Sequence, residues 1–285
     1  MRVIAVKKIE EAVSDLCVQA NLVLRKDVLE SLARAYQHEK NKKAKRALNA
    51  IIENAKIARA EKLAICQDTG MPCVFVEIGQ DVKILGDFKG AIVKGVEAGY
   101  KKGYLRNSIV RDPLVRGKSG YAPPMIHFDI VKGDSLRLSV LPKGFGCENK
   151  TQLKMFRPTA SLDSIKDFVV KTVREAGPDA CPPYVIGVGI GGTADYASLL
   201  AKRALLRKVE SRKSKVKSTG QKLKVQLMEK DLLKRINALN IGPMGLGGRT
   251  TALAVHIQTY PTHIAGLPVA VNISCHALRS ATAVI

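Results

Sequence analysis

The amino-acid sequence predicts a mixed α/β fold, in which an N-terminal helical layer precedes alternating strands, hairpins and helices. Apolar residues recur at steps of three and four throughout residues 4–62, which is typical of amphipathic helices. Later apolar runs are short and are separated by turns that contain glycine or proline, as in strands. With 285 residues, 46% of them apolar, the chain can bury a large core, as one large domain or as two smaller ones.

The N-terminal layer should consist of three helices. Breaks near residues 21–27 and near Asn41 separate three apolar stripes. Cys17 lies on the first stripe, so we expect its thiol in the core. The third helix leads directly into the stretch 61–79, EKLAICQDTGMPCVFVEIG.

The middle of the chain should form strands, one helix and a hairpin. Segments 125–131 and 135–144 alternate apolar and polar residues around a Lys-Gly-Asp turn, which predicts a β-hairpin. The preceding segments are expected to be two strands, one helix and one loop, in the order 74–79, 82–85, 88–108 and 111–124.

The last part of the chain should alternate helices and buried strands. We expect a helix over 161–177, a strand after Cys181, and a final strand that ends at Cys275. A turn at 261–263 would precede that final strand. The glycines of GVGIGGT fall as G-x-G-x-G-G rather than G-x-G-x-x-G, so they do not indicate a dinucleotide site.

The chain is strongly basic, with a formal net charge of +22. Residues 202–235 hold thirteen Lys or Arg and three acidic residues, but no aromatic residue to stack on a base. We interpret this segment as solvated helix faces around a Ser-Thr-Gly loop, and a nucleic-acid-associated protein is a distant alternative. No long uncharged apolar run and no signal peptide are present, so we expect no membrane partner and a cytoplasmic location.

The stretch 61–79 combines residues suited to chemistry at one turn. Cys66, Gln67 and Asp68 place a thiol, an amide and a carboxylate side by side between a helix and a strand. This arrangement suits a metal site with proton transfer, although these residues alone favour an ordinary Asp-Thr-Gly turn with a buried thiol.

Other candidate residues lie on turns elsewhere. Arg106 is either a surface residue or a carboxylate clamp, since its planar fork matches two carboxylate oxygens. Gly146 belongs to a glycine turn that could cradle an anion at the start of a helix, where Cys147 could also be a metal ligand. His263 falls on a turn, whereas His256 falls within an apolar strand and is expected in the core.

Several long motifs together resemble the alpha component of the iron–sulfur hydro-lyases, the class I fumarate hydratases and L-tartrate dehydratases. The motifs, in the same order as in that family, are CQDTGMP, GFGCENKTQLKMF, CPPYVIGVGIGGT, GPMGLGGRTTALAVHI and THIAGLPVAVNISCHALR. The resemblance covers nearly the whole chain and implies that residues 1–285 form a hydro-lyase alpha-type catalytic domain.

The resemblance also implies a site. A 4Fe-4S cluster with one open iron would be held by Cys66, Cys181 and Cys275, whose wide spacing alone is only weak evidence for a metal site. Cys147 would not be a ligand, because single-chain relatives commonly have serine there. Asp68 and His263 would transfer protons, and the substrate-binding residues would be Gln67, Arg106 and Gly146.

The same resemblance implies a partner and a reaction. The residues implied so far include no base to remove a proton from the substrate carbon. Single-chain relatives carry a second domain with further site residues. We therefore expect a separate beta subunit, in an α2β2 assembly. The expected reaction is the reversible hydration of fumarate, a small dicarboxylate, to L-malate. Dehydration of tartrate to oxaloacetate is the alternative, because tartrate differs from malate by only one hydroxyl.

Overall fold

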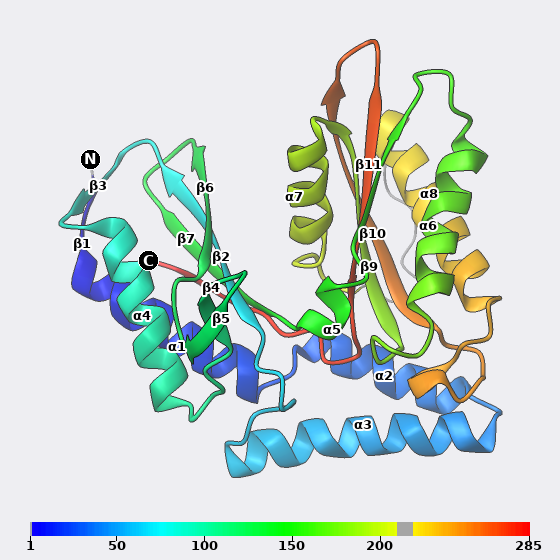
Figure 1. The fold of residues 1–285 in the computed structure, drawn as a ribbon, viewed down its shortest axis with the longest axis horizontal. Helices are drawn as coiled ribbons and strands as arrows, with labels where there is room; N and C mark the ends of the chain where they lie inside the picture. Colours follow the sequence, from blue (N-terminus) through cyan, green and yellow to red (C-terminus); the bar gives the residue numbers. More distant parts are fainter. Residues whose placement is uncertain (1, 210–218) are drawn as a thin grey trace. The chain divides into compact units, whose positions relative to one another are not determined.

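The computed structural model describes residues 2–209 and 219–285, which form two compact units (Figure 1). Unit 1 contains the described residues up to Arg25, together with Asn54–Phe145 and Arg279–Ile285. Unit 2 contains Lys26–Glu53 and the described residues of Gly146–Leu278. Because the chain enters each unit more than once, segments that are far apart in the sequence meet inside both.

Unit 1 is built on a four-stranded sheet with the order β12-β7-β2-β6. Helices α1 and α4 pack on each other, and α1 covers strands β7 and β12 (Figure 1). Two further strand pairs, β1 with β3 and β4 with β5, complete the unit. Its elements are β1 (Arg2–Ala5), α1 (Val6–Leu22), β2 (Met71–Gly79), β3 (Val82–Leu85), α4 (Phe88–Lys102), β4 (Ile109–Asp112), β5 (Arg116–Gly120), β6 (Met125–Val131), β7 (Leu136–Lys143) and β12 (Ala281–Val284).

The predicted hairpin between β6 and β7 is wrong, although both strands exist. Strand β2 lies between them and pairs with β6 in parallel and with β7 in antiparallel orientation. The end of β2 enters the expected turn, where the N–H of Gly79 donates to the carbonyl of Ser135 at 2.8 Å. A turn sequence fixes how the chain reverses, but the apolar β2 can bury both its faces and edges only at the centre of the sheet.

Three further segments of unit 1 differ from the prediction. The first residues form strand β1, which pairs in parallel with β3, instead of joining the first helix. The segment expected to be a loop over 111–124 contains part of β4 and all of β5. The last residues form β12, which pairs with β7. These strands are short and lack a long alternating pattern, so only their tertiary partners reveal them.

Unit 2 is built on a mixed sheet with the order β10-β9-β11-β8. Helix α7 covers one face, and α6 and α8 cover the other (Figure 1). Helix α3 contributes residues to both units. The elements are α2 (Lys26–His38), α3 (Lys42–Glu61), α5 (Phe145–Glu148), β8 (Gln152–Phe156), α6 (Leu162–Ala176), β9 (Tyr184–Gly192), α7 (Ala194–Ala204), α8 (Gly220–Asn237), the 3-10 helix η1 (Pro243–Gly245), β10 (Ala252–Thr262) and β11 (Leu267–Ser274).

The glycines of strand β9 serve packing between helix and sheet. A Cβ atom on Gly187 or Gly189 would come within 2.0 Å of a carbonyl oxygen of α7, at Ala201 and Ala197 respectively. Glycine therefore allows α7 to lie directly against the strand. This explains the motif GVGIGGT without a bound dinucleotide.

The basic segment 202–235 is described in part. Its ends belong to α7 and α8, as expected for helices, whereas residues 210–218 lie outside the described residues. Within the described residues, no helix has both the length and the apolar character needed to cross a membrane.

Candidate functional site

The turn that carries Cys66, Gln67 and Asp68 leads from α3 into β2 in unit 1. The carboxylate of Asp68 accepts two main-chain hydrogen bonds of 2.9 Å, from the N–H of Gly70 and from the N–H of Phe145. The Cys66 thiol donates to the amide oxygen of Gln67 at 3.5 Å. Asp68 is half-buried and Gln67 is exposed, so the structure places both polar groups where a ligand could reach them.

Gly70 fixes the path of the chain after this turn. Its φ is +71°, and a Cβ atom would lie 2.7 Å from the carbonyl carbon of Pro142. Glycine is therefore required both by its backbone conformation and by the close approach of β7.

Arg106 is tied to the same turn through its main chain. The hydroxyl of Thr69, which is 2% exposed, accepts from the N–H of Arg106 at 3.1 Å and donates to its carbonyl at 3.3 Å. The hydroxyl of Tyr100 donates to the carbonyl of Thr69 at 2.8 Å, and burial raises the pKa of this hydroxyl. The structure thus brings together three predicted residues, Gln67, Asp68 and Arg106, in unit 1.

Arg279 also supports this turn, and sequence reasoning missed it. Its guanidinium donates to the carbonyl of Asp68 at 2.8 Å and to the side-chain oxygen of Asn21 at 3.2 Å. Arg279 closes the last of the quoted motifs, but a sequence does not show that an arginine is buried.

In unit 2, the structure brings the segments of Cys181 and Cys275 together. The carbonyl of Cys181 accepts from the main-chain N–H of His276 at 3.3 Å and lies 3.1 Å from its ring Nδ1. Cys181 has a φ of +56°, which is unusual for a residue other than glycine. Cys181 and Cys275, two predicted ligands that are far apart in the sequence, therefore lie on neighbouring segments of the fold.

Burial divides the six cysteines into two groups. Cys66, Cys181 and Cys275 are partly exposed, whereas the remaining three are buried, as predicted for Cys17. Burial raises the pKa of the Cys17 thiol to about 12, so this thiol stays protonated. The buried Cys147 thiol donates to the carbonyl of Ala180 at 3.3 Å.

The chemistry of the three accessible thiols fits an iron–sulfur cluster, whose usual ligands are cysteine thiolates. Cys66 belongs to unit 1, and Cys181 and Cys275 belong to unit 2. Among residues 2–209 and 219–285, no three His, Cys, Asp or Glu side chains stand together as a group that could hold a metal ion. The ligand set therefore stays a prediction.

The histidine within β10 and the histidine on the turn after it differ in burial, as expected. His256 is 4% exposed within β10. His263 is exposed on the connection to β11, where its Nδ1 accepts from the N–H of Ala265 at 3.1 Å. The turn begins slightly later than predicted, because β10 continues through Thr262.

The glycine turn around Gly146 is anchored by a polar network. Helix α5 has only four residues and includes Gly146, and strand β8 follows this turn instead of the expected helix. The carboxylate of Glu148 accepts from the ammonium of Lys202 at 2.5 Å and from the amide of Asn272 at 3.0 Å. Gly146 itself is exposed.

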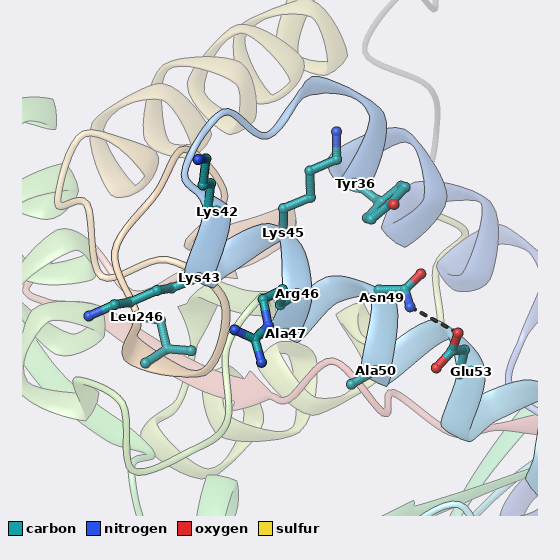
Figure 2. Close-up of a pocket in the computed structure, with 10 residues that line it drawn as sticks. All are labelled: Tyr36, Lys42, Lys43, Lys45, Arg46, Ala47, Asn49, Ala50, Glu53 and Leu246. Atoms are coloured by element: carbon teal, nitrogen blue, oxygen red, sulfur yellow. Dashed lines mark hydrogen bonds between the residues drawn. The ribbon is translucent and has the colours of Figure 1, made fainter.

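A separate basic groove of about 1010 Å³ lies against α2 and α3. None of the predicted site residues lines it. Figure 2 shows that its basic side chains point in different directions. The Nζ atom of Lys45 lies 4.9 Å from the centre of the ring of Tyr36. The four basic residues are Lys42, Lys43, Lys45 and Arg46.

Comparison with known proteins defines the class. The family model described as "Fumarate hydratase (Fumerase)" matches residues 10–284, so the chain belongs to this family of iron–sulfur hydro-lyases. A protein of Methanocaldococcus jannaschii, provisionally named as the alpha subunit of L(+)-tartrate dehydratase, is 41% identical over 284 residues, which cover 96% of each chain.

Two bacterial relatives carry the same name. The L(+)-tartrate dehydratase subunits alpha of Escherichia coli strains UTI89 and K12 are 29% and 28% identical to this chain, respectively. Both alignments cover 98% of this chain and 91% of the relative. The similarity thus extends over both units.

Proposed function

We propose that the chain is the alpha subunit of a two-subunit iron–sulfur hydro-lyase that dehydrates L-tartrate to oxaloacetate. One observation carries the proposal: the three partly exposed cysteines are the three that the family resemblance marks as cluster ligands. The three other cysteines are buried, and burial makes them poor ligands.

The choice of tartrate replaces the initial expectation of fumarate. Three relatives that align over nearly the whole chain are named for tartrate. The description of the family model as fumarate hydratase keeps fumarate as the second candidate. Both substrates are four-carbon dicarboxylates, and the extra hydroxyl of tartrate needs its own hydrogen-bond partner.

The residues of this chain have distinct roles in the proposed reaction. Cys66, Cys181 and Cys275 would hold the cluster, which when bound supplies a Lewis acid for the departing hydroxyl. Two main-chain N–H groups orient the carboxyl group of Asp68, which in its protonated form would give a proton to the departing hydroxyl, so that this group leaves as water. We assign His263 as its proton-transfer partner.

Substrate carboxylates need cationic and amide partners. Arg106 and Gln67 lie on segments joined by Thr69, and we assign them to the two ends of the dicarboxylate together with the main-chain N–H of Gly146. Water loss requires removal of a proton from the neighbouring carbon, and none of the assigned residues performs this step. We propose that a beta subunit supplies the base in an α2β2 assembly, and that residues 1–285 act as one catalytic domain.

Anaerobic reconstitution tests the ligand set. The chain and a beta subunit are co-purified, loaded with iron and sulfide, and assayed for bound iron as wild type and with serine at Cys66, Cys181, Cys275 or Cys147. We expect about four irons per alpha chain in the wild type and in the Cys147→Ser control, and loss of iron in the other three variants. Retention of iron by all three would contradict the proposed cluster.

Substrate assays on the same preparations test the reaction. The proposal requires a larger kcat/KM for L-tartrate than for fumarate or L-malate, and little turnover by the alpha chain alone. A preference for fumarate would replace the proposed substrate with the second candidate. Full activity of the lone chain would refute the role of the beta subunit.

A further inference from the structure

Arg279 is a buried cation that has only neutral partners. Its side chain follows β11 and precedes β12, and the residue is 3% exposed. Both of its hydrogen-bond acceptors are uncharged oxygens, the carbonyl of Asp68 and the amide oxygen of Asn21. Among the described residues, no carboxylate oxygen lies within 4.0 Å of its guanidinium, and its buried Nε atom has no hydrogen-bond partner.

Such a position is electrostatically unfavourable. A guanidinium stays protonated in proteins, and burying a charge without a direct ion pair costs free energy that two hydrogen bonds to neutral oxygens only partly return. Stability alone therefore does not explain why an arginine occupies this place.

The location of the Arg279 guanidinium indicates which negative charge it could balance. The guanidinium holds the carbonyl of Asp68, so it lies directly behind the turn that carries Cys66 and Gln67. Gly144 borders the same region: a Cβ atom placed there would lie 3.2 Å from Oδ2 of Asp68 and 3.8 Å from Nη2 of Arg279. Negative charge that gathers at this turn would therefore meet a fixed positive charge in a poorly solvated setting.

We propose that Arg279 is a positioning residue that supplies the buried positive charge of the Cys66–Asp68 turn and so favours anionic groups bound there. Those groups are the thiolate-held cluster and the dianionic substrate, so this inference rests on the proposed function. Two hydrogen bonds to neutral oxygens keep the guanidinium in place while leaving its charge available.

A purely structural clamp is the competing explanation, and the two make opposite predictions. If Arg279 is only a clamp, removing it destabilises the chain and leaves ligand affinity unchanged. If Arg279 supplies charge, replacing it by a neutral residue relieves an unfavourable burial in the empty chain and weakens anion binding. The lysine variant separates charge from shape, because it keeps the cation but loses the planar fork.

The test uses the complex of both subunits with Arg279→Gln, Arg279→Met and Arg279→Lys. Arg207→Gln is the control, because Arg207 donates to the carboxylate of Glu229 at 2.5 Å and so has the direct ion pair that Arg279 lacks. Melting temperature without cluster, iron content after reconstitution, and KM and kcat for L-tartrate are measured for each variant.

We expect Arg279→Gln to keep the melting temperature of the cluster-free chain, to lose iron more readily, and to raise KM about tenfold or more, as for loss of a buried charge partner. Arg279→Lys should recover most of the iron content and affinity. Arg207→Gln should lower the melting temperature without changing KM.

The opposite pattern would overturn the inference. A melting temperature that falls in Arg279→Gln as much as in Arg207→Gln, with wild-type iron content and KM, would identify a clamp. Failure of both neutral variants to fold while Arg207→Gln folds would lead to the same conclusion. If the wild-type complex turns over neither tartrate nor fumarate, the proposed function fails, but melting temperature and iron content still decide the role of Arg279.

Discussion

The two segments that carry the predicted cluster ligands are held in place by different means. In unit 1, side chains secure the Cys66–Asp68 turn, through the hydroxyl of Thr69 and the guanidinium of Arg279. In unit 2, Cys181 is held mainly by the main chain, with a φ of +56° and a carbonyl bonded to the N–H of His276. Hydrogen bonds made by side chains can be deleted one at a time by substitution. Hydrogen bonds made by the main chain cannot, because they depend on the path of the backbone.

This difference implies that single substitutions should separate stability from function more cleanly in unit 1 than in unit 2. Around Asp68, individual contacts can be deleted while the sheet stays intact. Around Cys181, the main-chain bond to His276 joins the segment before β9 to the segment after β11. The following predictions test this contrast, from the largest expected effect to the smallest.

Asp68→Asn should produce the largest loss. The amide keeps the shape of the side chain but cannot transfer the proton, so we expect kcat of the two-subunit complex to fall by about 10²–10⁴. Its one acceptor oxygen can serve only one of the two main-chain N–H groups that Asp68 holds, so the melting temperature should fall as well. Steady-state kinetics with L-tartrate measure this effect. The exposed Asp195→Asn is the control and should behave as wild type. A decrease in kcat of less than threefold, roughly, would exclude Asp68 from general acid–base catalysis.

Gly70→Ala should cause the largest loss of stability. Its Cβ atom would collide with the main chain of Pro142, and its φ of +71° is strained for alanine, so we expect a loss of about 3 kcal/mol or more in the free energy of unfolding. Urea denaturation measures it. Gly133→Ala is the matched control, because Gly133 also has a positive φ but no atom within 4 Å of its Cβ position, and it should cost about 1 kcal/mol. Equal losses would show that the close approach to β7 is unimportant.

Thr69→Val and His276→Ala compare the two scaffolds directly. Valine removes both hydrogen bonds to Arg106, so we expect KM for the dicarboxylate to rise by a factor of about 5–10. His276→Ala keeps the main-chain N–H that bonds Cys181, so iron content should stay within about 20% of wild type. If the histidine variant loses iron while Thr69→Val keeps its KM, the contrast between the two scaffolds is wrong.

Asp231→Asn should have the smallest effect, and only on stability. A hydrogen bond from Lys166 holds the pKa of Asp231 below its ordinary value of 3.8. The contribution of this carboxylate to stability is therefore present above pH 3.8 and is lost as pH falls further. The side chain is about one-third exposed, so solvent screening limits the contribution to about 0.5 kcal/mol. Below pH 3.8, the free energy of unfolding of Asp231→Asn should therefore change less with pH than that of the wild type, while KM stays unchanged. An altered KM would connect this ion pair to the site.

The sequence determined the helices and the buried strands of unit 2 because their periodicities are long and regular. The three N-terminal helices, the burial of Cys17 and His256, and the turn position of His263 all follow from such local patterns. The family resemblance follows from long motifs in a fixed order, and comparison confirms it over residues 10–284.

Only the tertiary structure decided which strands pair and which polar groups are buried. Local patterns indicate a strand at β6 and at β7, but the insertion of β2 between them depends on how the whole sheet buries apolar surface. Likewise, the approach of Cys181 to His276 and the burial of Arg279 arise from segments far apart in the chain. Their energies depend on solvent exclusion and on partners that one stretch of sequence does not contain, so these features appear only once the chain has folded.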